Sequence, residues 1–234
     1  MIDFHSHILP NVDDGVKSLE QSIELIDEAE KVGFTGIIST SHYIQGYYED
    51  DEEQRRKILN ELQGKSPKMK LYLGSEIYSD LEMIKYIKEG KSSTINGSRY
   101  VLFEFPLNSE PLFAKKLVYD LLSENYVPII AHPERYSYVQ ENLNFIEELV
   151  QMGALLQSNY GSIVGLYGHK AKRTVKELFK KDLIKFMGSD VHRVGQVYPL
   201  IPKILKKIGK IISEEKLYEI TTLNPEKVLK NEEI

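Results

Sequence analysis

The sequence predicts an α/β fold built on parallel strands. Short β-type runs alternate with helical segments from one end of the 234-residue chain to the other, and seven β-then-α units follow one another without a break in composition. Right-handed crossovers limit such a chain to an open doubly wound sheet or a barrel. No linker or low-complexity tract divides the units, so we expect one domain over residues 1–234.

The seven predicted strands are short apolar or β-branched runs bounded by turn residues. In chain order they are Met1–Phe4, Gly36–Ser41, Lys70–Gly74, Tyr100–Phe105, Val127–Ala131, Ala154–Ser158 and Ile184–Gly188.

The predicted helices follow these strands, and some carry clear end signals. The first, Leu19–Val32, should begin with a capping box of Ser18 and Gln21 and end at Gly33. The next is the charged stretch Glu49–Gln63, in which the run EDDEEQRRK is expected to form a solvated face. Further helices are expected near Leu81–Lys88, Leu112–Glu124, Leu143–Met152 and Ala171–Lys181. Two or three more finish the chain, the last with Asn224 as N-cap and Pro225 at its first position.

Composition excludes several classes of protein. The chain has no cysteine, which excludes disulfides, zinc–thiolate sites, iron–sulfur clusters and cysteine nucleophiles. A formal net charge of −5 indicates no general affinity for nucleic acid or for an anionic membrane. No stretch approaches the ~18 apolar residues of a membrane span, and the N-terminal sequence MIDFHSHILP lacks the features of a signal peptide. We therefore expect a cytoplasmic protein without membrane insertion.

Ionisable side chains gather where the predicted strands end. Five of the six histidines and three carboxylates lie there, namely His5, His7, His42, Glu76, Glu104, His132, Asp190 and His192. Because the carboxyl ends of parallel strands converge on one rim of a barrel, this pattern predicts a single site. Asp14, from the acidic turn NVDDG, is a ninth candidate. His169 lies at a predicted helix start and is expected to be a surface residue outside the site.

Metal binding is the chemistry that these residue types favour. Imidazole and carboxylate without thiolate suit manganese, iron, zinc and similar hydrolytic metals. On an extended strand, His5 and His7 point to the same side and can share an ion. One ion with four to six contacts cannot use nine ligands, whereas two or three ions that share a bridging carboxylate can. Taken singly, each residue has a structural alternative; Asp14, for example, could be a turn residue beside Gly15.

Seven short motifs occur in order along the chain. They are HSH near residue 5, DDG at 13–15, TSH at 40–42, GSEIY at 74–78, FEF at 103–105, AHPERY at 131–136 and SDVH at 189–192. Together they resemble the PHP superfamily, named for polymerase and histidinol phosphatase. Within it, the chain is most similar to bacterial manganese-dependent protein-tyrosine phosphatases of capsule and exopolysaccharide regulation. The NPEKVL segment near 224–229 extends the resemblance over nearly the whole chain.

The resemblance implies a distorted, TIM-like (β/α)7 barrel with a trinuclear metal site. His5, His7, Glu76 and Asp190 would hold one ion; Glu76 would bridge to a second, bound by Glu104 and His132; Asp14, His42 and His192 would hold the third. Manganese is the expected metal, with iron, zinc, cobalt or magnesium as alternatives. A hydroxide bridging two ions would attack the phosphorus of phosphotyrosine in line. The expected substrate is a phosphotyrosine protein, the tail of a bacterial tyrosine kinase that controls polysaccharide export.

Two arginines are candidate catalytic residues. Arg135, three residues beyond His132, is the candidate for neutralising the phosphoryl oxygens, with a structural salt bridge as its alternative role. The family has a second phosphate-binding arginine several residues after the SDVH motif, where this chain reads RVGQVYP. Either Arg193 takes that role from a different backbone position, or the loop works without it.

Two further features lie at the predicted rim of the site. The aromatic run from His42 to Tyr48 could stack against an aryl phosphate or simply pack the loop. Asn159 is expected to be a hydrogen-bonding residue at the end of its strand.

Three other functions remain open. The chain could be a small-molecule phosphatase such as histidinol phosphatase, although the lack of an obvious lid insertion favours a site that admits a peptide. A non-catalytic metal-binding PHP domain would be marked by lost ligands, and none is missing here. A PHP nuclease is disfavoured by the net charge of −5 and by the lack of a basic stripe in the sequence.

Overall fold

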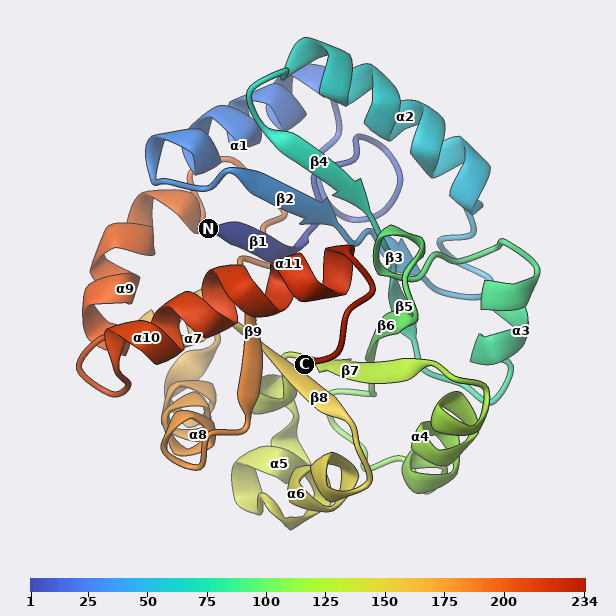
Figure 1. Ribbon diagram of the computed structural model, residues 1–234, viewed down its shortest axis with the longest axis vertical. Coiled ribbons are helices and arrows are strands. Elements are labelled where there is room, and N and C mark those ends of the chain that lie inside the picture. Colours follow the sequence, from blue (N-terminus) through green and yellow to red (C-terminus); the bar gives the residue numbers. More distant parts are fainter.

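Parallel strands form the centre of the molecule and helices surround them, as Figure 1 shows for the computed structural model, which describes residues 1–234. The strands are β1 Ile2–Ser6, β2 Gly36–Ser39, β3 His42–Tyr43, β4 Lys70–Leu73, β5 Glu76–Tyr78, β6 Tyr100–Glu104, β7 Val127–Ala131, β8 Leu155–Asn159 and β9 Ile184–Gly188. They pair in two parallel sheets, with the orders β1-β2-β4 and β3-β5-β6-β7-β8-β9.

The two sheets are continuous with each other. Two residues separate β2 from β3, and two separate β4 from β5. Backbone hydrogen bonds carry the pairing across these breaks: the amide of Gly74 donates to Ser39 over 2.8 Å, and that of Glu76 donates to Thr40 over 3.0 Å. Each pair of short strands is therefore one strand with an interruption.

The remaining edges, β1 and β9, meet at their carboxyl ends. There the Asp190 amide donates to the carbonyl of His5 over 2.8 Å, and the His7 amide donates to the carbonyl of Val191 over 3.1 Å. With each interrupted strand counted once, seven strands surround a common interior. The predicted distorted (β/α)7 barrel is confirmed, and the interruptions are part of its distortion.

The helices lie outside the strands or across one end of the barrel. They are α1 Leu19–Lys31, α2 Glu52–Lys65, α3 Met83–Lys88, α4 Ala114–Ser123, α5 Ser137–Glu141, α6 Asn144–Gln151, α7 Tyr160–Val164, α8 Gly168–Lys180, α9 Ile201–Ile208, α10 Glu214–Tyr218 and α11 Asn224–Leu229. A π-helical turn, Glu219–Leu223, joins α10 to α11. None of the helices combines the length and the apolar character needed to cross a bilayer.

Two hydrophobic clusters hold the fold together. The larger lies between the strands and the surrounding helices. The smaller fills the barrel interior, where the rings of Phe4 and Phe186 stack with centroids 4.1 Å apart. Val228 of α11 joins this inner cluster, and Figure 1 shows α11 lying across the barrel end. The amino-terminal end of the barrel is thus closed by apolar packing, which leaves the carboxyl end for polar residues.

The observed helix ends correct two predictions. The Ser18 side chain accepts from the Gln21 amide over 3.4 Å, but the Gln21 side chain accepts from the Lys17 amide, so only half of the predicted capping box is present. Asn224 is not an N-cap, because the π-helical turn before it already supplies helical backbone. Its side-chain amide instead donates to the carbonyl of Lys185 over 3.0 Å and ties α11 to β9.

Several elements differ from the sequence prediction. Helix α2 begins at Glu52 rather than Glu49, since Asp51 forms a complete capping box with Gln54. Strand β2 ends at Ser39, two residues earlier than expected. Four short elements were not predicted, namely β3, β5, α5 and α7. Each has two to five residues, too few for a periodic pattern to be visible.

Gly188 provides a test of the packing between β1 and β9. A methyl group there would lie 2.5 Å from Cβ of His5 and 2.8 Å from Nε2 of Gln157. We expect Gly188→Ala to lower the free energy of unfolding by about 1–3 kcal/mol, because overpacking forces neighbours to move. Gly64→Ala in α2, where nothing lies within 4 Å, is the matched control and should stabilise by up to ~1 kcal/mol. Equal urea midpoints for the wild type and Gly188→Ala would contradict this packing.

Candidate metal centre

The structure brings the nine predicted ligands together at the carboxyl ends of the strands. Three overlapping groups have ligand atoms that all lie within 4.8 Å of one another: His5, His7, Glu76 and Asp190; His42, Glu76 and Glu104; and His7, Asp14, His42 and His192. The ninth residue, His132, joins them through Glu76.

Glu76 lies at the centre of the site and is fully buried. Its Oε2 atom is 3.1 Å from Nε2 of His5 and 3.2 Å from Nδ1 of His42. Its other oxygen, Oε1, is 2.7 Å from Nε2 of His132. The two oxygens therefore face imidazoles from three different strands, as expected for a bridging carboxylate.

The first group matches the ligand set predicted for one ion. The Nε2 atoms of His5 and His7 are 3.1 Å apart. Oδ1 of Asp190 lies 3.6 Å from the first of these nitrogens and 3.4 Å from the second. Two imidazole nitrogens and two carboxylates thus converge on one point.

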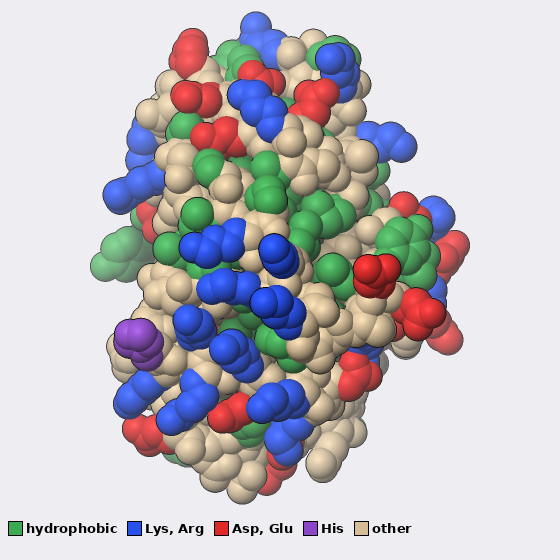
Figure 2. All heavy atoms as spheres, turned by 90° about the vertical axis from the view of Figure 1, so that its left-hand side faces the viewer, with side chains coloured by type: hydrophobic (Ala, Val, Ile, Leu, Met, Phe, Trp, Pro, Cys, Tyr) green, Lys and Arg blue, Asp and Glu red, His purple; other side chains and the backbone are tan.

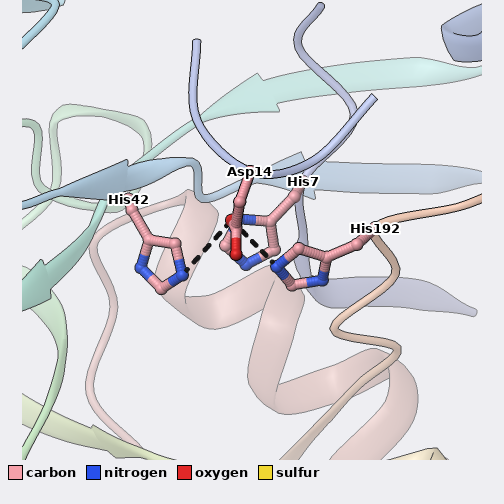
Figure 3. Close-up of side chains that lie close together, drawn as sticks. All are labelled: His7, Asp14, His42 and His192. Carbon is pink, nitrogen blue, oxygen red and sulfur yellow. Dashed lines mark ion pairs between the residues drawn. The ribbon is translucent and has the colours of Figure 1, made fainter. Parts of the chain in front are cut away.

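A second group surrounds Asp14, as Figure 3 shows. Oδ1 of Asp14 is 3.2 Å from Nε2 of His192 and 3.7 Å from Nε2 of His42. The rings of His7 and His192 stack with centroids 4.0 Å apart. The structure therefore adds His7 to the predicted set of Asp14, His42 and His192.

The third group differs most from the sequence-based ligand set. Glu104 was expected to share an ion with Glu76 and His132, and its Oε2 atom lies 3.8 Å from Nε2 of His132. Its Oε1 atom is 3.6 Å from Nδ1 of His42, which completes a more compact group with Glu76. His42 thus presents one ring nitrogen to each of two groups.

Unusual backbone geometry orients the side chains of His132, Asp190 and His5 toward the site. His132 and Asp190 have φ angles of 33° and 52°, in the left-handed region. Such backbone is strained by about 1–3 kcal/mol per residue and persists only where the surroundings enforce it. The pairing of β1 with β2 also shifts register between Asp3 and Ser6. This irregularity allows both Phe4 and His5 to reach the interior, although neighbouring strand residues normally face opposite sides.

Asp13 is a site residue that sequence reasoning missed. Its Oδ2 atom is 2.7 Å from Nδ1 of His7 and accepts from the backbone amide of His42 over 2.8 Å. Asp13 is buried, whereas the side chain of Asp14 is 53% exposed. The DDG turn thus supplies one positioning carboxylate, Asp13, and one candidate ligand, Asp14. The two adjacent aspartates in the sequence were the only local indication that Asp13 belongs to the site.

Polar residues of β8 form a second layer behind the ligands. Oε1 of Gln157 is 2.9 Å from Nδ1 of His5, and its Nε2 donates to Oδ1 of Asn159 over 3.0 Å. Nδ2 of Asn159 in turn donates to Oδ2 of Asp190 over 2.6 Å. This chain of contacts orients two ligands, His5 and Asp190. Asn159 forms the hydrogen bond that was expected at the end of its strand. The role of Gln157 was not predicted, because nothing in the neighbouring sequence indicates its contact with His5.

The two candidate arginines lie in different surroundings. Nη1 of Arg135 is 2.7 Å from Oδ2 of Asp190, and its guanidinium lies 4.6 Å from the centre of the Tyr167 ring. A quarter of its side chain is exposed, so it borders the mouth of the site. The side chain of Arg193 is exposed and forms no hydrogen bond or ion pair. His169, on α8, is exposed as predicted.

The aromatic run after β2 shows the loop packing that was one of its two expected roles. Tyr43 is buried and packs its ring 5.2 Å from that of Tyr86, which is loop packing. Tyr48 stacks on His42 with centroids 6.2 Å apart. Tyr47 is 83% exposed beside the site and is free to meet a bound molecule.

Burial shapes the charge state of the site. Burial, together with the nearby charge of Glu76, raises the pKa of Glu104 well above its usual range. Burial lowers the pKa of His42 and of His132, and Arg135 lowers the latter further. Both imidazoles are therefore neutral at pH 7, which is the form that binds a metal ion.

A family model for "Capsular polysaccharide synthesis, CpsB/CapC" matches residues 1–230. The chain belongs to the CpsB/CapC family. The assignment made from the ordered motifs is thereby confirmed.

Named relatives of this CpsB/CapC chain are tyrosine phosphatases. "Tyrosine-protein phosphatase YwqE" of Bacillus subtilis is 34% identical over all of this chain and 93% of its own length. "Tyrosine-protein phosphatase CpsB" of Streptococcus pneumoniae is 32% identical over 98% of each chain. A solved structure from work on YwqE and CpsB, described as "unique metal-dependent tyrosine phosphatases", has a TM-score of 0.92 and 33% identity over all of this chain and 96% of that one.

A more distant structure shares the fold. Histidinol phosphate phosphatase from Lactococcus lactis has a TM-score of 0.60 and 17% identity, over 90% of this chain and 93% of its own. At 17% identity, this comparison supports only a shared barrel fold and does not extend to activity.

Tyr136 tests how the turn after β7 is held. Its hydroxyl donates to the carbonyl of Ala131 over 2.7 Å and accepts from the amide of Phe105 over 3.0 Å. We expect Tyr136→Phe to lower the free energy of unfolding by about 1–3 kcal/mol, because two buried backbone groups lose their partner. Chemical denaturation measures this.

Tyr138 offers a matched control, since its ring stacks on that of Tyr136 and its buried hydroxyl has no partner. Tyr138→Phe should leave stability unchanged or slightly raised. Equal losses in the two variants would show that the Tyr136 hydrogen bonds do not support this turn.

Proposed function

We propose that the chain is a metal-dependent protein-tyrosine phosphatase that hydrolyses phosphotyrosine at the barrel mouth. The observation that carries the proposal is the convergence of nine imidazole and carboxylate side chains around the buried Glu76. The names of the relatives supply the substrate class.

The donor set fits divalent cations. It combines nitrogen and oxygen ligands without thiolate, which suits manganese, iron, zinc, cobalt or magnesium, and we propose manganese. The buried carboxylate of Glu76 and the half-buried carboxylate of Glu104 share one ligand group, where cations would stabilise their like charges. Nδ1 of His42 is buried without a hydrogen-bond partner and faces both of these carboxylates. A metal ion would satisfy all three groups.

Two or three ions fit the overlapping groups. We propose His5, His7, Glu76 and Asp190 for the first, Glu76, Glu104 and His132 for the second, and Asp14, His42 and His192 for the third. Since His42 lies equally near the second group, it is placed to share in both. Bound divalent ions supply an acidified water as nucleophile and neutralise phosphoryl oxygens.

The chain itself contributes orientation and charge. Asp13 fixes the ring of His7, and Gln157 fixes that of His5, so that each presents Nε2 to the site. Arg135 directs one nitrogen to Asp190, which leaves its other N–H groups for a phosphoryl oxygen. Arg193 remains a second candidate for this role, since it lies directly after His192 and is unpaired.

The leaving group also favours a tyrosine phosphate. A phenol has a pKa of ~10, so phenolate departs with less protonation than the alkoxide of serine requires. Exposed Tyr47 and the half-buried Tyr48 lie beside the site and offer aromatic surface to the phenyl ring. We propose that the protein is cytoplasmic and that its substrate is the tail of a bacterial tyrosine kinase of polysaccharide export, in keeping with the family description.

Hydrolysis of a phosphotyrosine peptide and of L-histidinol phosphate, measured side by side, tests the proposal. We expect the metal-stripped protein to be inactive on both. Reloading with manganese should restore release of phosphate from the peptide by at least roughly 100-fold, the scale expected of metal-activated water. Restored activity on histidinol phosphate alone would replace the proposal by a small-molecule phosphatase.

Two histidine variants control this experiment. His132→Ala removes a buried imidazole 2.7 Å from Glu76 and should abolish most of the turnover while the fold persists. His169→Ala changes an exposed histidine on α8 and should behave like the wild type. Full turnover in His132→Ala would rule out the proposed ligand role.

Arg135→Ala should lower kcat for an aryl phosphate by roughly 10²–10³-fold, the usual effect of losing one preorganised donor in an active site. Metal content, measured by elemental analysis, should stay at the wild-type level, because the nine proposed ligands are intact. Arg135→Lys keeps the charge but not the paired donors, so it should recover only part of the rate. An unchanged kcat in Arg135→Ala would make this residue structural.

A further inference from the structure

A dense group of lysines covers the outer faces of α8 and α9, and none of these lysines is a candidate metal ligand. Figure 2 shows Lys and Arg side chains gathered on this side of the molecule, although the chain as a whole has a net charge of −5. We call this surface the lysine face and define it by Lys172, Lys176 and Lys180 of α8 with Lys203, Lys207 and Lys210 of α9 and the turn after it.

The spacing of these lysines places them in two basic stripes, whereas no basic stripe was expected from the sequence. Those of α8 recur every four residues, and those of α9 are separated by four and then three. Residues at these spacings share one face of a helix. The opposite faces carry buried apolar residues such as Val175 and Ile204, so the lysines must point outward.

The two stripes lie beside each other. Helix α7 packs against both α8 and α9, and its Ile163 lines a surface pocket of about 380 Å³ between them. Five lysines and Ile211 complete the lining of this pocket, namely Lys172, Lys176, Lys180, Lys207 and Lys210 with the isoleucine. Partial burial and the charges of four neighbouring lysines lower the pKa of Lys207.

No acidic side chain compensates this charge. None of the six lysines forms an ion pair, whereas lysines elsewhere pair with acidic neighbours, such as Lys57 with Glu53 at 2.8 Å. Like charges four residues apart destabilise a helix. Repulsion among these lysines therefore destabilises the isolated protein. An anionic partner that covers the lysine face would relieve this repulsion.

We propose that the lysine face is a docking surface for an anionic lipid bilayer. The side chains that line its pocket offer ammonium donors and apolar contact but no hydrogen-bond acceptor, which suits phosphate head groups. A peptide would leave its own N–H groups without side-chain acceptors there. All six basic residues are lysines, flexible point charges that suit mobile anions, whereas recognition of a fixed anion geometry favours arginine.

Docking in this way leaves the metal site open. Helix α8 begins directly after Tyr167, whose hydroxyl lies 3.4 Å from Oδ2 of Asp190, so the lysine face adjoins the barrel mouth without covering it. A molecule held at an anionic bilayer would therefore keep its mouth beside the membrane surface. The inference does not depend on the reaction proposed for the site.

Co-sedimentation of the full chain with lipid vesicles tests the proposal. We expect binding to vesicles of phosphatidylglycerol and phosphatidylcholine, none to phosphatidylcholine alone, and release as NaCl rises from about 0.05 M to about 0.5 M, because salt screens the attraction. The triple variant Lys176→Gln, Lys203→Gln and Lys210→Gln changes three exposed residues and should lower the partition coefficient at least roughly tenfold.

A matched variant separates the lysine face from overall charge. Lys57→Gln, Lys68→Gln and Lys85→Gln together remove the same three charges from exposed side chains near α2 and α3 and should change binding less than about twofold. Metal-dependent hydrolysis of an aryl phosphate should be equal in both triple variants and the wild type. Thermal unfolding of the lysine-face variant should occur at the wild-type temperature or above it, since like-charge repulsion is relieved.

Two outcomes would overturn the proposal. One is equal loss of vesicle binding in both triple variants, which would reduce the effect to net charge. The other is failure to bind anionic vesicles while a poly-glutamate peptide binds and depends on the lysine face, which would assign the surface to an acidic protein segment.

Discussion

The site depends on one buried carboxylate, Glu76. An ionised group in the interior is strongly unfavourable unless other groups compensate it. Imidazoles of His5, His42 and His132 approach its two oxygens to within 2.7–3.2 Å from three different strands. The pairing of β3 with β5 sets His42 directly opposite Glu76, so strand register and site electrostatics support each other. Divalent cations at this point would offset the unfavourable free energy of the buried carboxylates and would supply the charge needed for phosphate hydrolysis.

A division of the barrel interior into two layers makes this possible. Toward the amino-terminal end, Phe4, Phe186 and Val228 fill the space with apolar side chains. Toward the carboxyl end, the strands break or bulge and the side chains become polar. The left-handed backbone of His132 and Asp190 belongs to this second layer, where strain is tolerated because the apolar base is rigidly packed.

The outer helices combine structural and surface roles. Helices α8 and α9 bury one apolar face each against the barrel and carry lysines on the other. The same chain thus has an anionic ligand cluster at its mouth and a cationic face beside it. Tyr167 connects the two regions, since it contacts Asp190 and Arg135 and immediately precedes α8.

The sequence alone predicted the order of strands and helices, and it predicted β7 and β9 with their observed bounds. It also placed eight of the nine candidate ligands at strand ends, because strand periodicity and end signals are local properties of the chain. Only the tertiary structure decided that His42 serves two groups, that Asp13 rather than Asp14 holds His7, and that Gln157 holds His5 across 152 residues of sequence. It also decided that the lysines of α8 meet those of α9. These contacts depend on barrel closure, strand register and helix packing, which join residues that no local pattern relates.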